Sequence, residues 1–195
     1  MKTLTTLMTV VTLSMANLMA SDESDVAVLT KNTIDNVIKL LRDKTLTNEV
    51  CKKKVQKELL KVFDLPLTAK LTLGRRHWPK LTAEQRKIFQ ELFIKQLINS
   101  YFDKAKLFSD QTINYEEPVR VKRKIHAAIN CVSKGEKIRI NNKFYKSSKG
   151  WRVYDLEIQG ISIVRSYGSQ YAQILKDGTV DDLLKKMRKL SEPKK

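Results

Sequence analysis

The chain has 195 residues, 42% of them hydrophobic, so it is long enough for one domain plus a leader and can bury most of that domain's apolar surface. Only six glycines and four prolines are present, and no repeat or low-complexity tract occurs, so we expect long loops and disorder to be minor. The formal net charge of +17 is typical of a protein that meets nucleic acid or an anionic membrane surface.

The first twenty residues are typical of a secretory signal peptide. Lys2 gives a short positive start, residues 4–18 carry no charge, and Leu18-Met19-Ala20 offers a cleavage site that a polar run follows. We therefore expect residues 1–20 to be removed near Ala20. This leaves a single domain over residues 21–195, whose last five residues, 191–195, form a tail. An uncleaved N-terminal anchor is the alternative, although the uncharged stretch is short for a membrane span of about 20 residues.

The expected export of the protein determines which partner its positive charge indicates. An exported protein rarely meets nucleic acid, so we expect no nucleic-acid partner. An anionic membrane surface is the better electrostatic partner, because each basic group near it contributes about 1 kcal/mol. A solvated basic surface that keeps the protein soluble is the alternative explanation of the charge.

Apolar residues at helical spacing predict four helices in the first half of the domain. Ser24 can cap a helix over residues 24–43, and Thr47 can cap a second one. A short apolar helix follows from Leu65, and Gly74 is its stop. Thr82-Ala83-Glu84-Gln85 is a capping box at the start of the fourth helix. The wide apolar face of that helix comprises Ile88, Phe89, Leu92, Phe93, Gln96, Leu97 and Tyr101.

The hydrophobic period then changes to that of strands. Four strands are predicted, over Gln111–Glu116, Val121–Val132, Lys137–Lys146 and Trp151–Ile158. Alternation is clear in the second strand, where Ile125, Ala127, Ile129 and Cys131 share one face. One-sided alternation indicates an antiparallel sheet with one covered face. Hairpin turns are expected at residues 133–135 and 147–150.

Two helices are predicted after the sheet. Ser162 can cap the first, which ends at Gly178, and Thr179 can cap the last over residues 180–190. The expected fold class is therefore α+β, with N-terminal helices, a four-stranded antiparallel sheet and C-terminal helices.

The residues that carry chemistry are few. Cys51 and Cys131 both lie on apolar faces, and an oxidising compartment permits a disulfide between them, so a bridge and two buried free thiols are equally open. His77 and His126 lack the spacing of zinc ligands, and no GxSxG motif is present. We expect that the protein binds no metal or cofactor and is not an enzyme. An exported lipid hydrolase is the rival interpretation.

Three stretches together resemble the MlaC family, also known as toluene-tolerance auxiliary proteins. The first block is residues 67–74 followed by Trp78, Leu81-Thr82, Gln85-Arg86, Phe89, Phe93, Leu97 and Tyr101. The second is residues 150–155 followed by Gly160-Ile161-Ser162 and Tyr167. The third is Gly178 with Val180, Leu183 and Leu184. The match extends in order over nearly the whole mature chain.

The resemblance implies a periplasmic phospholipid carrier that supports the lipid asymmetry of the outer membrane. It would exchange lipid with the substrate-binding hexamer of an inner-membrane Mla-type ABC transporter complex and with a lipoprotein–porin complex at the outer membrane. Phospholipid would be its bound ligand, with the tails in an apolar pocket between sheet and helices and the headgroup near solvent. We expect a monomer.

We predict the residues that line this pocket from the apolar faces of the helices and the sheet. Such a pocket should approach about 1,000 Å³, the upper end of the usual range for ligand sites. The segment Gly74 to Lys80 is a candidate hinge for opening it. The predicted lipid-binding residues are Leu67, Leu71, Phe89, Phe93, Leu97, Ile129, Ile140, Phe144, Val153 and Ile158.

Overall fold

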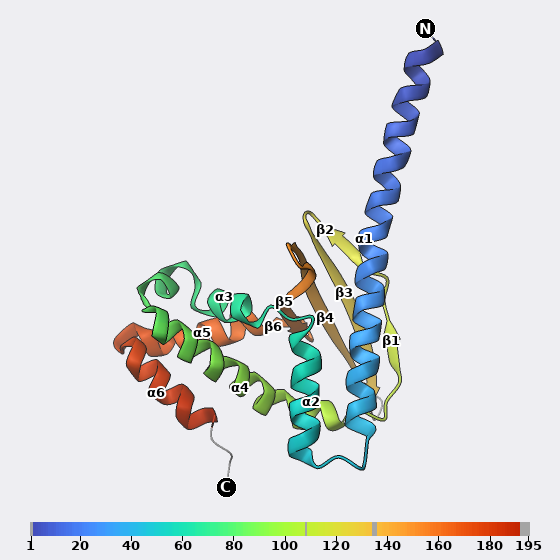
Figure 1. Cartoon of the computed structure of the whole chain (residues 1–195). Coiled ribbons are helices and arrows are strands. Elements are labelled where there is room, and N and C mark those ends of the chain that lie inside the picture. The colour runs from blue at the N-terminus through green and yellow to red at the C-terminus, as the bar shows by residue number, and fades with distance from the viewer. Residues whose placement is uncertain (1, 108, 134–135, 192–195) are drawn as a thin grey trace.

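The computed structural model describes residues 2–107, 109–133 and 136–191 and is shown in Figure 1. Helices precede and follow a single antiparallel sheet, so the expected combination of helices and antiparallel sheet is confirmed. No helix within these ranges is both long enough and apolar enough to span a membrane. The helices before the sheet are α1 (Lys2–Arg42), α2 (Asn48–Leu60), α3 (Leu65–His77), the 3-10 helix η1 (Trp78–Lys80) and α4 (Ala83–Leu107).

The sheet has six strands in the order β1-β3-β4-β5-β6, with β2 also paired to β3. The strands are β1 (Ile113–Tyr115), β2 (Val119–Val121), β3 (Lys124–Ser133), β4 (Glu136–Ser147), β5 (Gly150–Ile158) and β6 (Ile161–Ser162). The helices α5 (Ile163–Asp177) and α6 (Val180–Ser191) complete the described part of the chain.

The expectation of four strands is wrong, because two short hairpins were missed. Val121 pairs with Lys124 around a turn in which Lys122 has a φ of 58°. A lysine in the sequence does not predict this left-handed conformation, which non-glycine residues rarely adopt. Ile158 pairs with Ile161 around Gln159 and Gly160, which both have positive φ. The expected turn at 147–150 is present, since Ser147 pairs with Gly150. Lys134 and Gly135 of the other expected turn lie outside the described residues.

The first helix does not begin at Ser24, because α1 is continuous from Lys2. No glycine or proline separates the expected leader from the following helix, so nothing in the local sequence stops helical propagation there. Ser191 also differs from the expectation of a tail over 191–195. It ends α6 with 1% exposure and donates a hydrogen bond of 2.7 Å to the carbonyl oxygen of Met187. Residues 192–195 lie outside the described part.

The predicted helix caps other than Ser24 are present. Thr47 Oγ1 accepts a hydrogen bond from the Val50 backbone N–H, and Ser162 Oγ accepts one from Arg165. Thr82 and Gln85 bond each other reciprocally at 3.0 and 3.1 Å, as a capping box requires. Gly74 interrupts α3 with a φ of 61°, and the chain then resumes helical turns, so residues 75–80 are helical instead of an open loop.

Three buried clusters hold these elements together. Helices α3 to α6 share the largest cluster, in which Phe89 and Phe93 have 0% exposure. A second cluster joins α1 to β3, β4 and β5 around Val26, Ile125 and Trp151. A third joins α1, α2 and α4. Figure 1 shows the consequence, with α1 running along the sheet and α3 to α6 gathered beside it.

Candidate functional site: an apolar cavity between sheet and helices

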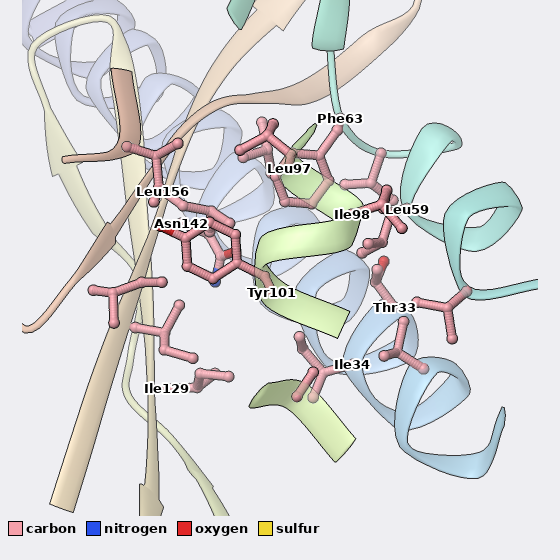
Figure 2. Close-up of a pocket in the computed structure, with 18 of the residues that line it drawn as sticks. Thr33, Ile34, Leu59, Phe63, Leu97, Ile98, Tyr101, Ile129, Asn142 and Leu156 are labelled. Carbon is pink, nitrogen blue, oxygen red and sulfur yellow. The ribbon is translucent and has the colours of Figure 1, made fainter. Parts of the chain in front are cut away.

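A cavity of about 390 Å³ lies between the sheet and the helices. Its walls come from α1, α2 and α4 on the helical side and from β3, β4 and β5 on the other (Figure 2). α4 packs against α3 and α6, and its residues from Ile94 to Ala105 also contribute to the cavity lining. Figure 2 shows Tyr101 extending from α4 across this space toward the sheet.

Regular alternation places the apolar side chains of β3 and β4 in the cavity. Ile129 pairs directly with Ile140, and Ile138, Ile140 and Phe144 point to one face because successive side chains alternate. Asn142 stands between them on the same face, and its Nδ2 donates a hydrogen bond of 3.1 Å to the Ala127 carbonyl oxygen. The sheet therefore presents a largely hydrocarbon surface with one fixed amide.

A β-bulge decides which side chains of β5 reach the cavity. The pairing of β4 with β5 shifts by one residue, so that Phe144 pairs with Val153 but Lys143 pairs with Asp155. Val153 and Leu156, three residues apart, therefore share the cavity face. Ile158 follows Leu156 with ordinary alternation. Strict alternation would put Val153 and Ile158, five residues apart, on opposite faces, and this shift explains how both reach the cavity together with Leu156.

Helical spacing supplies the other wall. On α1 the lining residues Ile34, Val37, Ile38 and Leu41 recur at three or four residues. On α4 the lining continues from Ile94 through Leu97, Ile98 and Tyr101 to Ala105. The α2 side contributes Val55, Leu59, Val62 and Phe63. Hydrocarbon thus makes up most of the lining that these helices contribute.

Several polar groups in the lining already have protein partners. Thr33 Oγ1 donates to the Leu29 carbonyl oxygen at 2.7 Å, and Thr68 Oγ1 donates to that of Asp64 at 2.9 Å. Thr30 is different, because its buried hydroxyl has no partner among the described residues. Satisfied hydroxyls behave as small apolar groups toward a ligand, so the cavity favours a ligand that is mostly hydrocarbon.

The ten predicted lipid-binding residues divide into two groups. Six line the cavity: Leu97, Ile129, Ile140, Phe144, Val153 and Ile158. The other four, Leu67, Leu71, Phe89 and Phe93, are not among its lining residues. Phe89 and Phe93 instead pack against Tyr171 and Tyr167 in the helical core, and Leu71 is 39% exposed.

The division of α4 has a physical cause. Phe89 and Phe93 are buried inside the cluster that α3 to α6 share, whereas Leu97 and Tyr101 lie at the border of that cluster and also line the cavity. Both pairs have the same apolar spacing in the sequence. The α1 and α2 residues were recognised as apolar helix faces but not as cavity walls, since spacing shows a buried face without showing what it faces.

The cysteines and histidines form no reactive cluster in the described part of the chain. Both thiols are buried and free, with Cys51 Sγ lying 3.2 Å from the Leu40 carbonyl oxygen and Cys131 lining the cavity. Burial raises the pKa of Cys131 and lowers that of His126, and burial beside Arg76 and Lys80 lowers that of His77. Within the described ranges neither histidine hydrogen-bonds a serine or cysteine, and no three metal-ligating side chains converge.

The fold and the cavity define an α+β domain with a partly open apolar site. The family model described as "MlaC protein" matches residues 31–189, and the chain belongs to that family. The resemblance noted in the sequence is thus confirmed.

A solved structure shares the fold at a TM-score of 0.77 with 23% sequence identity, covering 84% of this chain and 95% of the other. It is the phospholipid-binding protein from Ralstonia solanacearum, in complex with a phospholipid at 1.53 Å resolution.

Proposed function

We propose that this protein is a phospholipid carrier whose cavity shelters acyl tails while the headgroup stays near solvent. The observation that carries the proposal is the lining of the cavity, which is hydrocarbon along β3, β4, β5, α1, α2 and α4. Membership of the MlaC family supports it. So does the phospholipid bound by the Ralstonia protein of the same fold.

The energetics of tail transfer suit a carrier. Two tails contain about 30 methylenes, and keeping each out of water contributes about 0.8 kcal/mol, so escape of the lipid into water is negligible. In a bilayer the same tails are already dry. Transfer from membrane to cavity therefore changes the free energy little, and the docked partner decides whether lipid is loaded or released.

The length of the cavity fits an acyl tail. Its lining on β4 runs from Ile138 to Phe144, which spans about 20 Å at 3.4 Å per residue. A tail in one leaflet of a membrane with a hydrocarbon core of about 30 Å spans about 15 Å. The volume of about 390 Å³ is nearer the lower end of the usual range than the expected 1,000 Å³. We therefore propose that the helices move apart as a whole lipid enters, with Gly74 as a hinge.

We further propose that the carrier works in the periplasm as a monomer. Lys2, the uncharged residues 4–18 and the cleavage site at Ala20 support export. Asp22 and Glu23, immediately after that site, bond Arg120 of β2, so a mature chain that begins at Ser21 keeps these contacts. Its partners would be the hexamer of an inner-membrane Mla-type ABC transporter complex and an outer-membrane lipoprotein–porin complex. N-terminal sequencing of periplasmic protein tests the cleavage site.

Native mass spectrometry of protein isolated from the periplasm tests the carrier function. We expect intact phospholipid bound to the wild-type chain. Ile140→Glu places a charge in the cavity and should abolish the bound lipid, whereas Ile161→Glu changes an isoleucine that is 64% exposed and should not. Leu97→Trp, which fills the cavity without adding charge, should also reduce it. Retention of lipid by both cavity variants would show that the site lies elsewhere, and lysolipid or free fatty acid would favour the hydrolase.

A further inference from the structure

The cavity has one closed end. Phe144 and Val153 line it and also belong to the buried cluster around Val26, Ile125 and Trp151. Phe144 and Val153 are each 1% exposed, so solvent does not reach the cavity from that end.

Lys104 has the opposite character. It is the one exposed side chain among the described residues of the lining, and it lies in the last turns of α4. Asp155 is the other charged residue of the lining, but it is 5% exposed and bonded to Ser162 and Val164. A charged group that lies both at the cavity wall and in solvent marks where the apolar interior meets water.

The ammonium group of Lys104 is available to an anion. Within the described part of the chain no carboxylate lies within ion-pair distance of it and no hydrogen bond engages it. Its one contact is with the ring of Tyr101, one helical turn earlier, at 5.6 Å from Nζ to the ring centroid. This cation–π contact holds the lysine over a cavity-lining ring without consuming its three N–H donors.

We propose that Lys104 binds the phosphate group of the lipid whose tails occupy the cavity. This inference rests on the proposed carrier function and adds the residue that recognises the headgroup. The ligand that fits is an amphiphile with one apolar end and one negatively charged end. Its apolar end matches the buried lining at Phe144, and its charged end matches the free ammonium of Lys104. A phosphate common to all glycerophospholipids explains recognition of the class without selection among headgroups.

Lys106 provides a matched control. It lies in the same last turn of α4 and has the same favourable position in the helix dipole, but it does not line the cavity. Its Nζ donates instead to Asn48 Oδ1. Any effect of charge on helix stability is therefore shared by the two lysines, whereas contact with a bound lipid is expected of Lys104 alone.

The test compares two ligands with the same tails, dioleoyl phosphatidylglycerol and dioleoylglycerol, which lacks the phosphate. Each is used to displace the apolar fluorophore diphenylhexatriene from delipidated mature protein that begins at Ser21. Lys104→Gln should weaken phosphatidylglycerol about tenfold, equivalent to about 1.4 kcal/mol, and leave dioleoylglycerol within about twofold. Lys104→Arg should restore binding, and Lys106→Gln should match the wild type for both ligands.

Each other outcome has a distinct meaning. Equal weakening of both ligands in Lys104→Gln, or no weakening of either, would overturn the phosphate contact while leaving the carrier function standing. Failure of the wild-type protein to bind either ligand would instead overturn the carrier function. Titration with inorganic phosphate distinguishes the source of the anion. Tight binding of free phosphate that Lys104→Gln removes would mean a phosphate site unrelated to lipid.

Discussion

Ser162 Oγ donates a hydrogen bond of 2.7 Å to Asp155 Oδ2, linking the start of α5 to the strand β5 that precedes it. The other carboxylate oxygen of Asp155 accepts a bond of 3.1 Å from the Val164 backbone N–H. Lys143 Nζ lies 3.4 Å from the same carboxylate. One buried acid thus fixes both the first turn of α5 and its distance from the sheet, which sets one end of the cavity wall.

Asp155→Ala should lower the free energy of unfolding by about 2–4 kcal/mol, because it removes the acceptor of the Ser162 hydroxyl and of the Val164 N–H. It also removes one of the two carboxylates that pair with Lys143, the other being that of Glu157. Urea unfolding followed by circular dichroism measures the change. Asp177→Ala removes an exposed acid near the end of α5 and should cause little loss. Equal effects of the two substitutions would contradict the role given to Asp155.

Phe93 and Leu97 should differ sharply in stability effects although both are large apolar residues of α4. Phe93 has 0% exposure and stacks with Phe89 at a centroid distance of 6.2 Å, so Phe93→Ala should cost about 3–5 kcal/mol. Leu97 faces the cavity and lacks packing atoms on that side, so Leu97→Ala should cost clearly less. Among variants that still fold, we expect Leu97→Ala to reduce lipid binding more than Phe93→Ala does. A larger loss of stability at Leu97 would refute the division of α4 into core and cavity halves.

Glu116 should make stability depend on pH in the acidic range. Hydrogen bonds from Arg139 and then Asn130 lower the pKa of Glu116 from 4.5 to about 2. The folded-state pKa lies below the unfolded value, so the contribution is complete above about pH 5 and disappears as the pH falls through 4.5 toward about 2. Wild type should be more stable than Glu116→Gln near neutral pH, and the difference should shrink in acid.

Urea unfolding at several pH values from neutral to about pH 3 checks this prediction. Glu117→Gln is the control, because Glu117 is exposed and makes no hydrogen bond within the described part of the chain. A difference between wild type and Glu116→Gln that stays constant with pH would show that the effect is not ionic.

Cys51 and Cys131 should remain reduced thiols. Each is buried in the structure, Cys51 between α1 and α2 and Cys131 at the cavity wall. We expect thiol-reactive reagents to modify both after unfolding but neither rapidly in the folded protein, because the thiol must reach solvent as thiolate to react. Intact mass measurement of periplasmic protein checks the redox state. A mass lower by two hydrogens, with stability that falls on reduction, would establish a bridge instead.

Local sequence determined most of the element boundaries. The caps at Thr47, Thr82 and Ser162 occur where the residue pattern predicts them, because a side-chain oxygen that satisfies a free helix N–H acts within three residues. Alternation predicted the cavity face of Ile129, Ile140 and Phe144 for the same reason, since a strand's period is a local property. The three blocks of residues that resemble the MlaC family are also visible in the sequence alone.

Tertiary structure alone decided which apolar faces enclose a cavity and which fill a core. Phe93 and Leu97 have equivalent positions in the apolar pattern of α4, yet one packs against Tyr167 and the other lines an open space. The β-bulge that moves Leu156 to the cavity face likewise depends on how β5 pairs with β4. Periodicity reports that a side chain avoids water, whereas the volume left between α4 and the sheet depends on the packing of every element around it.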